Sequence, residues 1–192
     1  MRAVLRRLLA RLDSVTHGMA LASGAVFLAV SFFITLDVVG RKFFAISSAV
    51  TDEMGGYALA FGSMWALAWT LRTGGHVRID VILPKLPPTL RRVLDYLAMA
   101  VMILFAVMVA IYCWTLAYES FDTDARAMSF LRTPIFVPQG LLALGLSVLA
   151  IEAVVILLVG IIESLAAGRL VDLAVGREEE IAVPLVGDRP LV

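Results

Sequence analysis

The chain has 192 residues, of which 61% are hydrophobic, and its mean hydropathy is +0.94. Soluble domains are about 45–50% apolar, so this composition is typical of a membrane protein. Lys plus Arg and Asp plus Glu both number 16, and this zero net charge argues against a protein that binds nucleic acid.

Four apolar runs predict an all-α membrane protein with four transmembrane helices. The runs lie at about 18–36, 54–71, 93–118 and 135–162. Each run is long enough to cross about 30 Å of hydrocarbon as a helix, which satisfies its backbone polar groups without water. We therefore expect a four-helix transmembrane domain over residues 17–163.

The segments on either side of this domain are more polar. Residues 1–16 predict an amphipathic cytoplasmic arm, with leucines on one face and arginines on the other, that lies on membrane lipid. The alternative is that these arginines serve only to orient the chain. Residues 164–192 lose the apolar periodicity and predict a mobile cytoplasmic tail.

The distribution of positive charge predicts the topology. Of the 16 Lys and Arg residues, 12 lie in the N-terminal arm, in the segment between the second and third runs, and in the tail. The loops after the first and third runs carry the other 4. Because Lys and Arg are retained in the cytoplasm, we expect both termini on the cytoplasmic side of the membrane.

Charged residues flank the first loop. Asp37 and Arg41 are four residues apart, which predicts an ion pair on one helix face, or a pair that orients this helix end against a partner. Thr51 is a suitable N-cap for the second helix. Glu53 follows it in the first turn, where a carboxylate complements the helix dipole or contacts a partner.

Small residues recur along the second run. Ala58, Gly62 and Ala66 are spaced every four positions, and small residues on one face let helix backbones approach closely in lipid. We expect a tight packing seam here. The pattern leaves open whether the seam faces this chain's own helices or another subunit.

The connector from Arg72 to Pro88, RTGGHVRIDVILPKLPP, is the most polar internal segment. Its glycines permit a sharp exit from the second helix, and Pro87–Pro88 suits the start of the third. Four aliphatic residues at helical spacing predict an interfacial cytoplasmic segment between helices 2 and 3: Ile79, Ile82, Leu83 and Leu86.

Glu152 lies about two-thirds of the way along the fourth run. A carboxylate at this depth is a candidate functional residue. No basic residue inside the apolar runs is available to pair with it. It is therefore expected to be protonated, bonded to a Ser, Thr or Tyr hydroxyl, or facing a partner. A stand-alone proton-coupled exporter that uses Glu152 is a further hypothesis.

The sequence shows no residue pattern typical of a catalytic site or a cofactor site. The single cysteine, Cys113, makes no intramolecular disulfide, and the two histidines, His17 and His76, lie outside the apolar runs. We expect no enzyme activity, no metal and no cofactor. A haem-bearing membrane anchor would need axial ligands at membrane depth, and it is the alternative from a different class.

The run DEMGGYALAFGSMWALAWTLRTGGHVRIDVILPKLPPTLRR resembles the signature region of the TRAP transporter small permease (DctQ-type) subunits. In that family a carboxylate opens the second helix, as Glu53 does here, and a polar turn follows the helix. The residues that match this turn and the start of the third helix are Arg72, Gly75, His76, Asp80, Leu86 and Pro87. Asp37 and Arg41 also resemble the family pattern, whereas the second glycine before His76 and the absence of tryptophans over 133–138 depart from it.

The resemblance implies a small, non-catalytic subunit in the inner membrane of a bacterium. In this family a large multi-span permease subunit holds the substrate site and the coupling-ion site, usually for sodium, and a periplasmic binding protein delivers an organic acid. The small subunit braces the large one. The nearest alternative is the small membrane subunit of a tricarboxylate-type tripartite transporter. The candidate structural or partner-interface residues are Asp37, Arg41, Glu53, Arg72, Gly75, His76, Asp80, Pro87 and Glu152.

Overall fold

The computed structural model describes residues 2–46, 48–75, 86–173 and 175, with side chains from residue 7 onward. It contains four helices, namely α1 (Arg2–Phe44), α2 (Thr51–Arg72), α3 (Pro88–Asp122) and α4 (Phe136–Ala167). Within these residues there is no strand, only an isolated bridge between Arg126 and Pro134 in the α3–α4 loop. The all-α class is confirmed.

Three of these helices are long and apolar enough to cross a membrane, as judged over the described residues: α1 from Arg7, α3 and α4. The fourth expected span, α2, forms a helix of 22 residues but does not reach that standard. Its sequence carries Gly, Ser, Thr and Trp where the others carry more aliphatic residues. Along α2 only Asp52, Gly56 and Leu59 are exposed, because neighbouring helices cover most of its surface.

Helix α1 is longer than predicted. It continues without a break from Arg2 to Phe44, so the expected arm and the first span share one helix. Helix α3 extends beyond the predicted range 93–118 at both ends, and α4 extends beyond 135–162 at its C-terminal end. An apolar run marks only the stretch with no polar residues, whereas the backbone hydrogen-bond ladder continues through the amphipathic turns on either side.

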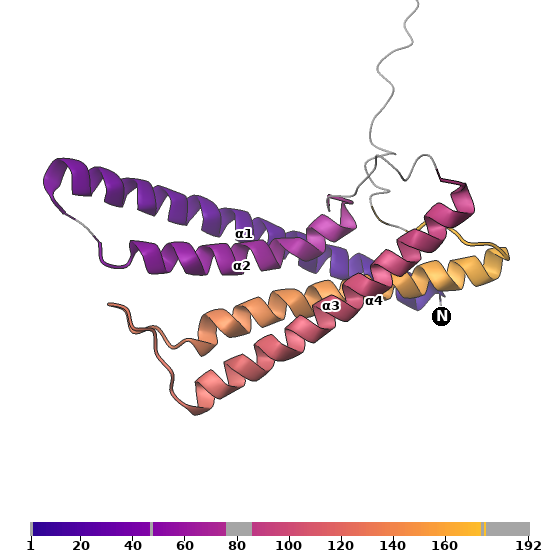
Figure 1. Ribbon diagram of the computed structural model, residues 1–192. Coiled ribbons are helices and arrows are strands. Elements are labelled where there is room, and N and C mark those ends of the chain that lie inside the picture. The colour runs from indigo at the N-terminus through magenta and orange to yellow at the C-terminus, as the bar shows by residue number, and fades with distance from the viewer. Residues whose placement is uncertain (1, 47, 76–85, 174, 176–192) are drawn as a thin grey trace, which may run out of the picture.

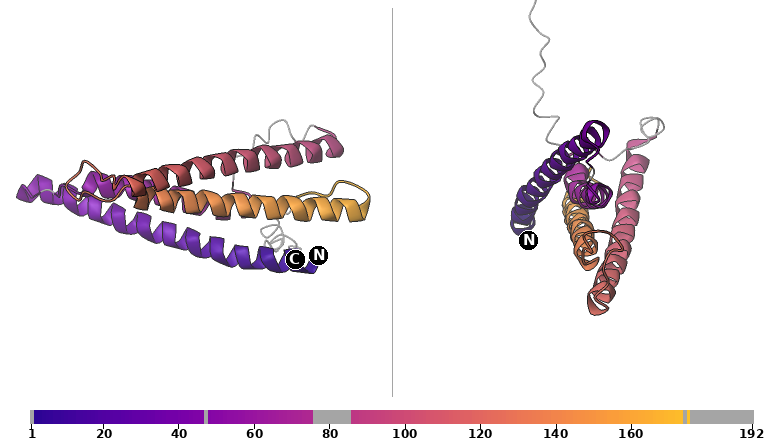
Figure 2. Two further views of the ribbon diagram at one scale, coloured as in Figure 1. Left: turned by 90° about the horizontal axis from the view of Figure 1, so that it is seen from below. Right: turned by 90° about the vertical axis from the view of Figure 1, so that its left-hand side faces the viewer.

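The helices form two antiparallel hairpins, α1–α2 and α3–α4, which meet mainly where α2 packs on α4 (Figures 1 and 2). Helix α1 makes a smaller contact with α4, and the chief neighbour of α3 is α4. The order across the molecule is therefore α1–α2–α4–α3. Both hairpin loops, 45–50 and 123–135, lie at the same end, which we call the loop end; the opposite end, with the N-terminus, is the terminal end.

Buried residues on α1 and α3 follow a seven-residue repeat. On α1 the buried positions are Leu9, Thr16, Ser23 and Asp37. On α3 they are Met99, Ala106, Ala110, Ala117 and Ser120. This spacing is typical of helices that pack side by side at a shallow angle, as in a left-handed coiled coil.

Helix α2 packs closely on both of its neighbours. On one side the Gly62 carbonyl accepts a hydrogen bond of 2.7 Å from the Ser23 hydroxyl of α1, and the Phe27 ring fills the space that a Cβ on Gly62 would need. On the other side a Cβ on Gly145 of α4 would lie 2.9 Å from the backbone of Met64. The small-residue seam therefore faces this chain's own bundle at Gly62.

We predict that Gly145→Ala lowers the thermal stability of the purified protein in detergent. The new methyl group would meet the α2 backbone, which cannot move aside as a side chain can, and such overpacking costs about 1–3 kcal/mol. Gly140→Ala on the same helix is the matched control, because a Cβ there has nothing within 4 Å. Equal melting temperatures for the two variants would contradict this account of α2–α4 packing.

Candidate functional site

Asp37 ties the last turns of α1 to the α1–α2 loop. Its Oδ2 accepts a hydrogen bond of 2.7 Å from Arg41 Nη2, so the predicted ion pair is confirmed. Its Oδ1 accepts a second bond of 2.5 Å from the backbone N–H of Ser48. Asp37 is 8% exposed, whereas the Arg41 side chain is 58% exposed, so the loop contact is the more shielded of the two.

The start of α2 differs from the prediction in one respect. Val50 occupies the N-cap position, no side-chain cap bond forms, and Thr51 is the first helical residue. The assignment of Thr51 as N-cap was wrong, because the chain turns into the helix one residue earlier. Asp52 and Glu53 do lie in the first turn, where their charge complements the helix dipole.

Glu53 lies just before the apolar stretch 54–71 and faces the α3–α4 loop. Its Oε1 accepts a hydrogen bond of 2.7 Å from the Tyr57 hydroxyl. The hydroxyls of Ser129 and Tyr57 lower the pKa of the Glu53 carboxyl from its ordinary value, and burial opposes them only in part. Ser129 Oγ and Glu53 Oε2 do not reach hydrogen-bond geometry, so Tyr57 makes the formed bond.

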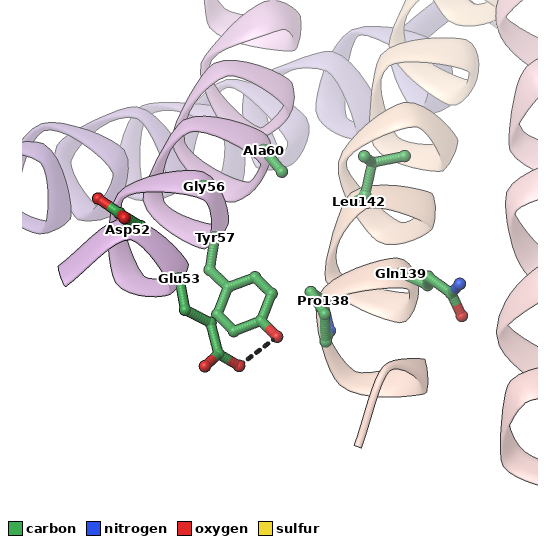
Figure 3. Close-up of a pocket in the computed structure, with 8 residues that line it drawn as sticks. All are labelled: Asp52, Glu53, Gly56, Tyr57, Ala60, Pro138, Gln139 and Leu142. Atoms are coloured by element: carbon green, nitrogen blue, oxygen red, sulfur yellow. Dashed lines mark hydrogen bonds between the residues drawn. The ribbon is translucent and has the colours of Figure 1, made fainter. Parts of the chain in front are cut away.

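An open groove of about 390 Å³ lies beside Glu53 at the loop end. It is lined from α2 by Asp52, Glu53, Gly56, Tyr57 and Ala60, and from α4 by Pro138, Gln139 and Leu142. Figure 3 shows the Tyr57 ring pointing toward Pro138 and the Gln139 side chain pointing away from α2. Its lining contains no histidine, cysteine or lysine, so the groove offers a contact surface with two carboxylates rather than a reaction site.

A second polar cluster joins α1, α2 and α4 toward the terminal end. Arg72 Nε lies 2.7 Å from Asp13 Oδ1 as an ion pair without hydrogen-bond geometry, and Arg72 Nη2 donates to Asp13 Oδ2 at 3.2 Å. One turn further along α1, the His17 ring packs edge-on to Trp69 at a centroid distance of 4.6 Å. We call Asp13, Arg72 and Glu152 the acid–arginine cluster, because Glu152 lies two turns beyond the contact of Gly145 with Met64 and so at the level of Arg72.

Glu152 is 0% exposed, and its two carboxylate oxygens accept no hydrogen bond from any described residue. It therefore presents no surface to a partner and is not bonded to a Ser, Thr or Tyr hydroxyl in the described part of the chain. The prediction considered only basic residues inside the apolar runs, and Arg72 directly follows the second run. Asp13 was also missed, since 59 residues separate it from Arg72 and no local pattern links them.

The remaining candidates lie at the ends of the α2–α3 connector. Gly74 adopts the left-handed φ of +73° after α2, and the Gly75 N–H donates to the Thr70 carbonyl at 2.9 Å. Pro87 precedes the first residue of α3, and its carbonyl accepts from the Arg91 N–H at 3.1 Å. His76, Asp80 and the expected interfacial segment lie outside the described residues.

The structure does not bring the candidate residues into one site. Asp37, Arg41 and Glu53 lie toward the loop end, whereas Arg72 lies at the opposite end of α2. Across the described ranges, no group of three or more His, Cys, Asp and Glu side chains could hold a metal ion. The geometry is that of a small multi-span membrane protein whose polar residues join its own helices.

The sequence comparison identifies the family. Residues 30–163 match the family described as tripartite ATP-independent periplasmic transporters, DctQ component. The match covers more than half of the chain, so the chain belongs to this family, and the resemblance found at residues 52–92 is confirmed. The match favours this family over the tricarboxylate-type alternative. No curated protein and no solved structure matches the chain.

We predict that Asp37→Ala lowers the melting temperature in detergent by several degrees, and by more than Arg41→Ala does. The first variant leaves the half-buried Ser48 N–H without its acceptor, whereas the second removes only a largely exposed partner. Thermal unfolding of the two purified variants beside the unaltered protein measures the difference. An equal or larger loss in Arg41→Ala would show that the loop contact is unimportant.

Proposed function

We propose that this chain is the small, non-catalytic integral membrane subunit of a TRAP-type secondary transporter. It braces the large permease subunit during ion-coupled uptake of an organic acid that a periplasmic binding protein delivers. Family membership makes the chain a transporter component. The observation that carries the bracing role is the open helix order α1–α2–α4–α3.

This order leaves whole helix faces available to a partner. A bundle that closed on itself would cover the inner faces of all four helices, whereas here α4 keeps an exposed apolar stripe. Its residues are seven apart: Val137, Leu144, Ile151, Leu158 and Leu165. A stripe at this spacing suits a straight transmembrane helix of the large subunit lying along α4.

The proposed topology has four crossings with both termini in the cytoplasm of a bacterium. Lys and Arg are concentrated in the arm, the α2–α3 connector and the tail, which supports it. Helix α2 can cross despite its lower apolarity, because α1 and α4 shield it from lipid. The loop end then faces the periplasm, within reach of the binding protein.

The residues of this chain indicate which functions belong to it and which belong to the large subunit. The substrate site and the sodium site are assigned to the large subunit, since the polar residues described here mostly join helices. The groove beside Glu53 and the Asp37–Arg41 pair are candidate contacts at the periplasmic side. The α2–α3 connector is proposed to fix how the second and third helices meet the membrane, through Arg72, Gly75, His76, Asp80 and Pro87.

We predict that an affinity-tagged form of this chain, extracted from its native membrane in a gentle detergent, recovers a much larger multi-span protein. Mass spectrometry identifies the partner. If bundle packing shapes the docking face, Gly145→Ala should recover several-fold less partner, and the control Gly140→Ala should recover as much as the unaltered chain. The proposal would be overturned if the chain were recovered alone, in an amount large enough for an equimolar partner to be detected.

A further inference from the structure

The acid–arginine cluster has one negative charge too many if all of its members are ionised. Arg72 carries one positive charge and is already paired with Asp13 at 2.7 Å. Glu152 would add a second carboxylate that is completely buried and accepts no hydrogen bond from the described residues. A buried ionised carboxylate without partners is strongly unfavourable, so among the described residues the protonated form of Glu152 is favoured over the ionised form.

A proton supplies the compensating charge without needing further ligands. No group of three or more His, Cys, Asp and Glu side chains that could hold a metal was found among the residues described. Helices α2 and α4 both run from the loop end to the terminal end (Figure 1), and Gly145 of α4 meets Met64 of α2, so Glu152, two turns further along, lies at the level of Arg72. Asp13 of α1 and Arg72 of α2 are paired there. Those two side chains are 26% and 16% exposed, so the ion pair is the partly open side of the cluster, through which a proton can exchange with water.

Asp13 also holds down the N-terminal part of α1. Leu9, Asp13 and Thr16 lie on one face of the helix, and Leu9 and Thr16 are 7% and 0% exposed. Arg72 is thus the charged link between this part of α1 and the end of α2. Its guanidinium has five N–H donors, so it can serve either carboxylate of the cluster.

We propose that Glu152 is a proton-binding site whose occupancy decides which carboxylate Arg72 pairs with. With the proton bound, Glu152 is neutral, and Arg72 stays with Asp13 and keeps residues 7–16 docked. When the proton leaves to water, the Glu152 carboxylate draws Arg72 from Asp13, and this part of α1 loosens. The inference concerns the bundle itself and does not depend on the proposed transport role.

The test measures the distance from the N-terminal part of α1 to the end of α4 as the pH is raised. Spin labels are placed at Leu8→Cys and Ala167→Cys, which are exposed positions, in a Cys113→Ala background. The full chain is studied in lipid nanodiscs with its co-purified partners by double electron–electron resonance. We expect the short distance to give way to longer or broader distances as the pH rises.

Three variants separate the proposal from a general pH effect. Glu152→Gln, which is permanently neutral, should keep the short distance at every pH. Asp13→Asn should show the loosened distances at every pH, because Arg72 then has no competing carboxylate on α1. Glu119→Gln, an exposed carboxylate on α3, should retain the pH transition of the unaltered chain.

A transition that persists unchanged in Glu152→Gln would overturn the proposal, as would the absence of any transition in the folded protein. A transition that follows sodium concentration at constant pH would overturn it in favour of a bound metal cation. If Glu152→Gln does not fold, infrared spectra of the unaltered chain decide. The C=O band of a buried carboxylic acid must disappear over the same pH range as the distance change, and a constant band would refute the proposal.

Discussion

The close packing of α2 between α1 and α4 is the constraint on which the rest of the structure depends. Lipid offers no hydrogen bonds, so the polar groups of this helix must find partners inside the protein. Its side-chain hydroxyls bond mostly within α2, and two further bonds cross to the neighbouring helices. The Gly62 carbonyl accepts from Ser23 on α1, and Trp65 Nε1 donates to the Leu141 carbonyl on α4 at 2.8 Å. Gly145 makes this approach possible, because any side chain there would meet the α2 backbone. The two hairpins are therefore joined through α2, the helix that falls short of the standard for a membrane span.

Under the proposed topology, this arrangement explains how α2 can cross the membrane without being strongly apolar. A helix that meets other helices on most of its surface needs small and hydrogen-bonding residues more than aliphatic ones. Helices α1, α3 and α4, which have more exposed surface, carry the long apolar runs that lipid requires. The open order that results leaves faces of α3 and α4 uncovered, and this is the physical basis of the proposed accessory role.

Much of the fold could be predicted from the sequence, because hydropathy and small-residue spacing are local signals. Helix existence, the Asp37–Arg41 pair and the start of α3 at Pro87–Pro88 all follow from residues within one or two turns of each other. What could not be predicted depends on tertiary contacts. Asp13 pairs with Arg72, which lies 59 residues away in the sequence, and the Ser48 N–H bonds to Asp37 because the α1–α2 loop folds back on α1. After α4, Val171 bonds to Tyr96 on α3 and to Ser164 on α4. The helix ends were also misjudged, since amphipathic turns continue a helix without adding to an apolar run.

The proposed role is that this chain supports the large subunit and does not itself move the substrate across the membrane. Reconstitution into proteoliposomes tests this role most directly. The large permease subunit, the binding protein and this chain are reconstituted together, and then with each membrane subunit left out in turn, and uptake of the organic acid is measured. We expect uptake only when both membrane subunits are present, and no uptake when this chain and the binding protein are reconstituted without the large subunit. Uptake by this chain without the large subunit would contradict it.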